Sequence, residues 1–222
     1  MDILIFGATG MVGQSVLREC LSASDVKRVV AVGRQSTGIL HQRLSEIVTP
    51  DLTNLEAHRD RLAPFDACFF CLGVSSVGMN EPDYARVTYD LTVSVAQLLL
   101  RENPQMIFIY VSGAGTDSTE QGKSMWARVK GRTENALIAL GFKGAYMFRP
   151  GVIQPINAVR SKTTAYRMAY VLAKPLFGIM RTFWPQSIVT SEQVGLAMLG
   201  VARHGYALAI LEVADIQDAA GN

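Results

Sequence analysis

Cysteine is scarce in this sequence of 222 residues, occurring only at Cys20, Cys68 and Cys71. An odd, low number of cysteines excludes the disulfide framework of small secreted proteins and favours a reducing compartment. Cys68 and Cys71 form a C-x-x-C pattern, but both lie in one predicted strand, where side chains three apart point to opposite faces. The histidines are scattered without ligand spacing. We therefore expect no metal site.

The sequence also lacks a strong charge of either sign and a long uninterrupted apolar run. Lys and Arg number 21 against 19 Asp and Glu, an excess too small for a nucleic-acid-binding protein. The longest apolar stretch, 163–184, contains Arg167, Lys174, Pro175 and Arg181. A transmembrane helix needs about 20 residues with few charges, and the first apolar run is too short for a signal peptide. We therefore expect a cytoplasmic protein without a transmembrane segment.

What the sequence has instead is an alternation of short apolar runs with amphipathic stretches. Continuous apolar runs are typical of strands that are covered on both faces, and hence of a parallel sheet. Strands are predicted at 3–6, 28–32, 45–48, 67–72, 106–112 and 145–148, with a further candidate at 209–213. Helices are predicted at 11–22, 53–62, 83–102, 124–140, 164–174, 176–183 and 191–203.

This pattern predicts an α/β fold, a Rossmann-type doubly wound parallel sheet with strand order 3-2-1-4-5-6. A chain of this length fits one domain, so we expect residues 1–222 to form a single dinucleotide-binding domain. Residues 150–190 are expected to form a small C-terminal cap on the substrate side. The basic and aromatic stretch from Tyr166 to Trp184 could also touch a membrane surface, but such a segment more often caps a substrate pocket or packs in a core.

The strongest chemical signal is the turn after the first predicted strand, Gly7-Ala8-Thr9-Gly10-Met11-Val12-Gly13. Gly7 permits the tight turn, Gly10 lets the backbone approach a pyrophosphate, and Gly13 lets the helix pack close to the sheet. The helix start also offers free N–H groups and a positive dipole end to phosphates. We therefore expect a nicotinamide dinucleotide here; the alternative is a purely structural turn.

The end of the second predicted strand indicates which dinucleotide is bound. An acidic residue there would bind the ribose 2′-hydroxyl of NAD, whereas an Arg would bind the 2′-phosphate of NADP. The strand ends Val32-Gly33-Arg34 with no carboxylate, so NADP is the expected cofactor and Arg34 its selector, unless Arg34 is simply solvated. Asp51 and Leu52 could contact the adenine edge; alternatively, Asp51 only organises the turn before a helix capped by Thr53.

Several segments together resemble the short-chain dehydrogenase/reductase superfamily, over nearly the whole chain to about Val213. The resemblance is closest to the atypical members that are similar to the Tat-interacting-protein oxidoreductase. It is carried by the glycine turn, by Cys71-Leu72-Gly73, by Val111-Ser112, by the stretch from Trp126 to Lys130 and by Arg149-Pro150-Gly151. The resemblance implies that Ser112 orients a substrate oxygen and that Lys130 holds the nicotinamide ribose.

One residue departs from that family pattern, because Trp126 stands where the family has its catalytic tyrosine, four residues before Lys130. An indole N–H only donates and cannot shuttle a proton at neutral pH. The spacing places Trp126 and Lys130 on one helix face, so we expect Trp126 to face the pocket; ordinary core packing is the alternative. Tyr84, Tyr89 or Tyr166 could supply the acid instead.

The sequence thus gives a defined set of candidate residues and three candidate functions. The candidates are Ser112 and Lys130 for catalysis; Gly7, Thr9, Gly10, Met11, Val12, Gly13, Arg34, Asp51, Leu52, Leu72, Gly73, Lys130, Pro150 and Gly151 for the cofactor; and Ser75, Ser112, Gly113 and Trp126 for the substrate. The first function is an NADP-dependent oxidoreductase acting on a small carbonyl compound.

The alternatives are a catalytically weak NADP-binding redox sensor or scaffold protein, and a nucleotide-sugar epimerase or dehydratase. The missing phenol favours the sensor and counts against both enzymes, because epimerases of this family use the same tyrosine. We expect either a monomer or a homodimer formed through the helices at 83–102 and 124–140.

Overall fold

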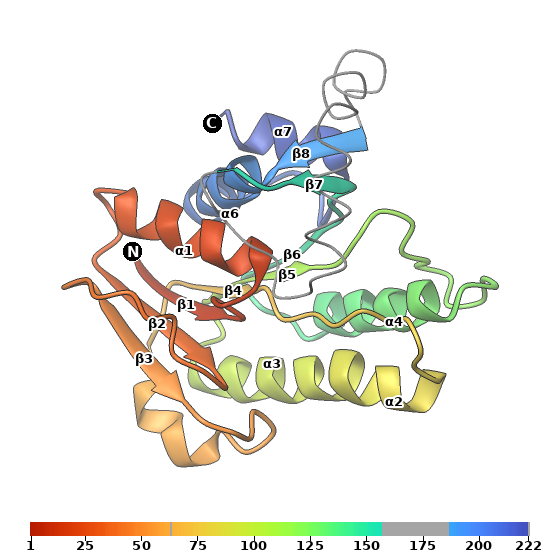
Figure 1. Cartoon of the computed structure of the whole chain (residues 1–222), viewed down its shortest axis with the longest axis horizontal. Helices are drawn as coiled ribbons and strands as arrows, with labels where there is room; N and C mark the ends of the chain where they lie inside the picture. The colour runs from red at the N-terminus through yellow and green to blue at the C-terminus, as the bar shows by residue number, and fades with distance from the viewer. Residues whose placement is uncertain (63, 157–186, 222) are drawn as a thin grey trace.

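The protein is built on a seven-stranded parallel sheet, shown in Figure 1 from a computed structural model that describes residues 1–62, 64–156 and 187–221. The strand order is β3-β2-β1-β4-β5-β6-β9, and all neighbours pair in parallel. The strands are β1 (Asp2–Phe6), β2 (Arg28–Gly33), β3 (Leu44–Val48), β4 (Ala67–Phe70), β5 (Ile107–Val111), β6 (Gly144–Phe148) and β9 (Ile210–Leu211). The doubly wound fold, the strand order and the added last strand are confirmed.

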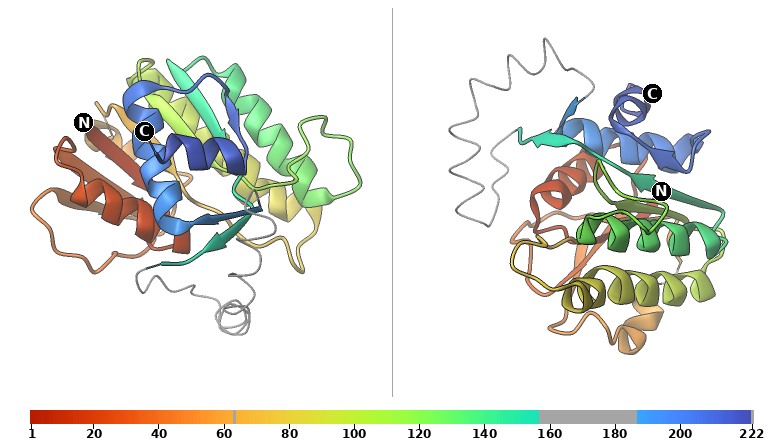
Figure 2. Two further views of the ribbon diagram at one scale, coloured as in Figure 1. Left: turned by 90° about the horizontal axis from the view of Figure 1, so that it is seen from above. Right: turned by 90° about the vertical axis from the view of Figure 1, so that its right-hand side faces the viewer.

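Helices cover both faces of this sheet, as Figures 1 and 2 show. Alternate side chains of β1 enter the two cores: Ile3 and Ile5 pack in one, and Leu4 and Phe6 in the other. Burial on both faces explains why the strands read as continuous apolar runs. One layer holds α1 (Met11–Ser22), α6 (Ser191–His204) and α7 (Val213–Ala219); the other holds α2 (Glu81–Ala85), α3 (Leu91–Glu102) and α4 (Met125–Ala139).

Two predicted helices differ from the structure. The helix expected at 53–62 is a 3₁₀ helix, Glu56–Arg61, without a side-chain cap, because the Thr53 hydroxyl donates to Asp51 instead. The helix expected at 83–102 begins at Glu81 and contains a π-helical segment, Arg86–Asp90, between α2 and α3. A π turn adds a residue and shifts the buried stripe of the helix, and Val87 within this segment is 39% exposed.

A second, two-stranded parallel sheet follows the end of β6. Its strands, β7 (Val152–Gln154) and β8 (Ile188–Thr190), were not predicted. The helices expected at 164–174 and 176–183 lie outside the described residues. In the described part of the chain, no helix has both the length and the apolar character needed to cross a membrane.

Candidate functional site

The glycine turn between β1 and α1 has the close packing that its sequence indicates. Gly7 has a φ of +80°, which side chains rarely tolerate, and a Cβ there would lie 2.8 Å from the carbonyl carbon of Cys71. A Cβ on Gly13 would lie 2.1 Å from the carbonyl oxygen of Gly7. The two glycines therefore let the start of α1 lie directly against the turn.

The start of α1 fits a phosphate group. Gly10 is the residue before the helix, and within the described residues no side chain caps this end and no acid lies in the first turn. The first N–H groups of a helix have no partner within the helix and carry partial positive charge. The turn therefore leaves N–H groups free to bind an anion such as the pyrophosphate of a dinucleotide.

Two cavities adjoin this turn along the carboxyl ends of the strands, and Leu72 lines both. The larger cavity, of about 970 Å³, includes these predicted residues in its wall: Gly10, Met11, Val12, Leu72, Gly73, Ser75, Ser112, Gly113, Lys130, Pro150 and Gly151. The smaller cavity, of about 420 Å³, includes Gly7, Thr9, Arg34, Leu52 and Leu72. The structure therefore brings most of the predicted site residues to one continuous edge of the sheet.

The Ser112 hydroxyl lies at the end of β5 and is hydrogen-bonded to a residue that the sequence did not reveal. Its Oγ is 2.9 Å from Thr116 Oγ1, and Thr116 Oγ1 also donates to the carbonyl oxygen of Gly113 at 2.7 Å. A hydroxyl carries one hydrogen, so Ser112 donates to Thr116 when both bonds are made. Its lone pairs then remain available toward the larger cavity.

Lys130 reaches the same cavity from α4. Its Nζ is 3.5 Å from the carbonyl oxygen of Val111 and 5.3 Å from the ring centre of Tyr110. Burial lowers the pKa of Lys130 to about 8, and the nearby carboxylate of Glu134 opposes that shift. An ammonium group held beside Ser112 at the cavity wall can donate hydrogen bonds or a proton to a bound ligand.

The smaller cavity holds a carboxylate, which corrects the expectation that none is available at the end of the second strand. Glu46 of β3 lines this cavity together with Arg34 and Thr37. Parallel pairing places Glu46 opposite Ala31 of β2, so the acid comes from the neighbouring strand. Arg34 is exposed, and in the described part of the chain it makes no ion pair. Both charges therefore border the same space.

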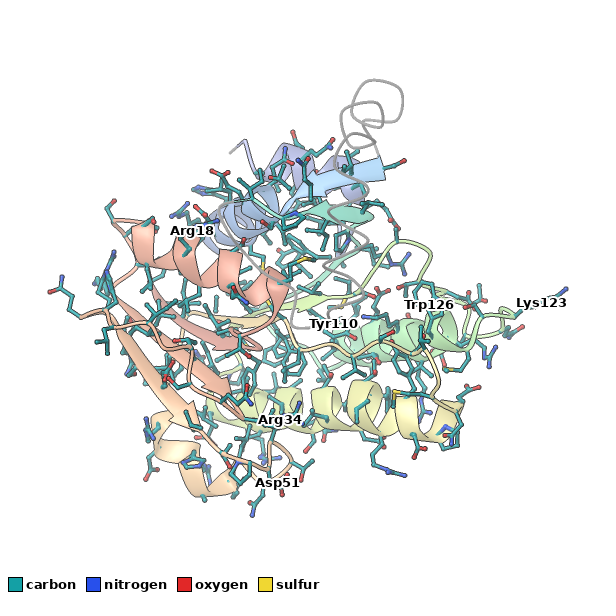
Figure 3. All side chains as sticks on the ribbon, in the orientation of Figure 1. Arg18, Arg34, Asp51, Tyr110, Lys123 and Trp126 are labelled. Atoms are coloured by element: carbon teal, nitrogen blue, oxygen red, sulfur yellow. The ribbon has the colours of Figure 1, made fainter. Side chains whose placement is uncertain are left out.

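Three predicted residues, Gly13, Asp51 and Trp126, do not lie in the described walls of the cavities. Asp51 is exposed and accepts hydrogen bonds from the N–H and hydroxyl groups of Thr53. This arrangement corresponds to the alternative in which Asp51 only organises the turn. The Trp126 ring lies beside Gly115 in the loop after Ser112. Figure 3 shows Trp126 near the start of α4, well separated from Arg34 beyond the end of β2.

Two of the three tyrosines considered as alternative acids, Tyr84 and Tyr89, lie outside the described wall of the larger cavity. Tyr84 is buried, and burial raises the pKa of its phenol. The ring of Tyr89 is covered by the guanidinium of Arg132, 3.9 Å from the ring centre. Tyr166 lies outside the described residues. Among the described residues that line the larger cavity there is no tyrosine.

A buried arginine holds the loop and helices around the larger cavity. Arg149, at the end of β6, donates to both carboxylate oxygens of Glu134 on α4, which is fully buried. It also donates to Ser118 Oγ, in the loop after Ser112, and to Glu212, which lines the cavity at the start of α7. The sequence showed Arg149 only through its Arg-Pro-Gly motif.

The names of similar curated proteins give a location in the cell. "Protein fmp52-1, mitochondrial" of Aspergillus oryzae is 28% identical over 155 residues, which is 67% of this chain and 64% of the relative. The chain thus matches less than two thirds of the length of this relative. Relatives of the same name from other organisms are also named mitochondrial. The expected cytoplasmic location is therefore contradicted, because these relatives are named mitochondrial.

Solved structures share the fold, and a family model matches the sequence. A short chain dehydrogenase/reductase family oxidoreductase from Burkholderia thailandensis superposes with a TM-score of 0.68 at 18% identity, over 98% of this chain and 92% of that one. WbmF of Bordetella bronchiseptica, in complex with NAD+, gives 0.68 at 13% identity, over 98% and 76%. The model of the NAD dependent epimerase/dehydratase family matches residues 3–124. This chain therefore belongs to the NAD dependent epimerase/dehydratase family and is a Rossmann-type, NAD(P)-binding protein.

Proposed function

We propose that this protein is an NADP-binding oxidoreductase of the atypical short-chain dehydrogenase/reductase type, acting on a small carbonyl compound or the corresponding alcohol. The observation that carries the proposal is the pair of cavities that meet at the glycine turn and Leu72. The smaller cavity has the place and the Arg34 side chain for an adenosine with a 2′-phosphate. The larger has Ser112 and Lys130 for a nicotinamide and a substrate.

The choice of NADP rests on Arg34. A guanidinium can form two parallel charge-assisted hydrogen bonds with a phosphate, and Arg34 lines the smaller cavity without an ion pair in the described residues. The structure of WbmF contains NAD+, so the dinucleotide class is shared with that protein, and the additional phosphate is the feature we propose for this chain.

Ser112 and Lys130 are the residues that we propose for the chemistry. A bound nicotinamide would supply or accept the hydride. Lys130 would hold the nicotinamide ribose and could release a proton toward the substrate oxygen, and Ser112 would bind the same oxygen. Trp126 cannot take the proton-transfer role of a phenol, so Lys130 is the titratable group best placed beside Ser112.

The first experiment is a calorimetric titration of the wild type and of Arg34→Ala with NADPH and with NADH. We expect the wild type to bind NADPH more tightly, and the substitution to weaken NADPH binding by roughly tenfold or more while NADH binding changes little. Asp51→Asn is the matched control, because Asp51 is nearby but outside the cavity wall. A wild type that prefers NADH, or an unchanged ratio in Arg34→Ala, would remove Arg34 as the selector.

A redox sensor or scaffold protein is the second candidate, and the absence of a tyrosine among the described residues lining the larger cavity favours it. NADPH consumption with a panel of aldehydes, ketones and quinones separates the two candidates. Turnover that Ser112→Ala reduces supports the enzyme. Binding of NADPH without any turnover supports the sensor.

The remaining assignments are proposals of the same kind. We place the chain in the group similar to the Tat-interacting-protein oxidoreductase, as a single domain that acts as a monomer or a homodimer. The tyrosine-dependent chemistry of a nucleotide-sugar epimerase or dehydratase is disfavoured, because Trp126 stands in place of the phenol. Light scattering at high protein concentration tests the oligomeric state.

A further inference from the structure

The carboxylate of Glu46 is held by three donors from the segment that follows β2. Its two oxygens accept hydrogen bonds from Ser36 Oγ at 2.5 Å, from the Thr37 N–H at 2.7 Å and from Thr37 Oγ1 at 2.5 Å. Burial alone would raise the pKa of Glu46, but these bonds lower it below its ordinary value. The carboxylate is therefore ionised at neutral pH.

These three donors are the kind of groups that bind phosphate. Hydroxyl groups and a backbone N–H that converge on one anion form a small anion-binding cradle, and Thr37 lines the smaller cavity with Arg34. Glu46 supplies the anion from within the chain. No sequence pattern indicates this arrangement, because Glu46 lies on β3 and its donors lie in the segment after β2.

We propose that Glu46 acts as an internal substitute for phosphate, occupying the donors of Ser36 and Thr37 and thereby limiting the affinity of the smaller cavity for a 2′-phosphorylated adenosine. The inference rests on the proposed function, since it concerns the same subsite. Glu46 acts in two ways: it keeps three donors from the phosphate, and its negative charge opposes that of the phosphate across the cavity.

The geometry makes Glu46 a specificity-determining residue with an effect opposite to that of Arg34. Arg34 increases the affinity for a ligand that carries a 2′-phosphate, and Glu46 decreases that affinity. The wild type is therefore expected to prefer the phosphorylated ligand only moderately, and removal of the Glu46 charge should increase that preference. Removal of the neighbouring Asp51 charge should not, because Asp51 binds Thr53 outside the cavity wall.

The experiment measures binding of 2′,5′-ADP and of 5′-ADP to the full chain by calorimetry. Glu46→Gln keeps the size of the side chain and a carbonyl acceptor for Thr37 but removes the charge. It is expected to tighten 2′,5′-ADP binding by roughly tenfold, the size expected from one screened charge at close range, with 5′-ADP binding unchanged. Glu46→Ala empties the cradle and should give a gain of the same sign. Asp51→Asn should leave both affinities as in the wild type.

Several outcomes would overturn the inference. One is an unchanged affinity of Glu46→Gln for 2′,5′-ADP, and another is an equal gain in affinity for 2′,5′-ADP and 5′-ADP. A third is a loss of affinity for both ligands in Glu46→Gln but not in Asp51→Asn, which would show that Glu46 only supports the structure. If Glu46→Gln binds 2′,5′-ADP more tightly and Arg34→Ala binds it as the wild type does, the inference about Glu46 holds and Arg34 is not the selector. The two proposals therefore fail separately.

Discussion

At the level of single residues, the buried ammonium group of Lys130 lowers the stability of the folded protein. A lysine at a cavity wall with its pKa lowered to about 8 is less favourable as a cation in the folded state than in water. Strongly perturbed groups of this kind cluster at functional sites. Lys130 lines the larger cavity, and its lowered pKa agrees with a role there.

This residue gives a pH-dependent prediction for the cofactor-free protein. Below pH 8 Lys130 is charged in both the folded and unfolded states, so the full unfavourable effect of burial is present. Between pH 8 and about 10.4 the folded protein has lost this proton and the unfolded chain has not, so stability rises with pH. Lys130→Met should therefore stabilise the protein by roughly 1–3 kcal/mol at pH 7, and the gain should shrink toward pH 10.

Urea unfolding at several pH values measures this difference, with Lys123→Met as the control, because Lys123 is exposed. A destabilising Lys130→Met, or a difference that stays constant from pH 7 to pH 10, would contradict the account.

Sequence reasoning located the residues whose role depends on local chain geometry. Gly7 and Gly13 were found because a turn with close backbone contacts restricts side chains in a recognisable pattern. Ser112 and Lys130 were found through their family positions. Glu46 and Thr116 were missed, because their roles arise from hydrogen bonds made after strands and loops come together.

At the scale of secondary-structure elements, the ion pair of Arg149 and Glu134 joins β6 to α4. Arg149 is 8% exposed and Glu134 is fully buried, and the same guanidinium binds Ser118 and Glu212. The pair therefore fixes the loop after Ser112 and the start of α7 relative to the helix that carries Lys130. We expect the shape of the larger cavity to depend on it.

Breaking the ion pair of Arg149 and Glu134 should lower the free energy of unfolding. Glu134→Gln leaves the buried guanidinium of Arg149 with Glu212, which is about half exposed, as its charged partner. Removal of the buried partner of such an ion pair destabilises proteins by about 3–5 kcal/mol. Glu212→Gln is the matched control, because Glu212 is about half exposed, and its change should be below about 1 kcal/mol. Urea unfolding compares the two variants. Equal effects, or a loss below about 1 kcal/mol in Glu134→Gln, would show that the pair does not hold these elements.

The bounds of helices and strands could be predicted where the apolar residues follow a regular pattern. They could not be predicted where the backbone departs locally from regular geometry. The strands were found because burial on both faces leaves continuous apolar runs. The π-helical segment Arg86–Asp90 was missed, because its extra residue per turn leaves no mark on an apolar period read as 3.6 residues. The short strands β7 and β8 were missed because each pairs only with a segment distant in the sequence.

At the scale of the whole molecule, cofactor binding should stabilise the fold, because both cavities are built from residues of several distant elements. A ligand at 100 times its Kd adds about 2.7 kcal/mol to the stability of the folded state. For a chain of this length that corresponds to a rise in Tm of roughly 5–10 °C. Thermal unfolding with NADPH measures it, and Arg34→Ala should show a smaller rise at the same NADPH concentration. No rise at saturating NADPH would contradict binding to the folded protein.

We expect a nicotinamide dinucleotide to lie across the glycine turn with its two ends in the two cavities. A crystal structure of the protein with NADP tests this most directly. We predict the pyrophosphate at the N–H groups of the first turn of α1, the 2′-phosphate beside Arg34, and the nicotinamide ribose beside Lys130 and Ser112. A dinucleotide bound away from the Gly7–Gly13 turn, or with its nicotinamide outside the larger cavity, would contradict the account.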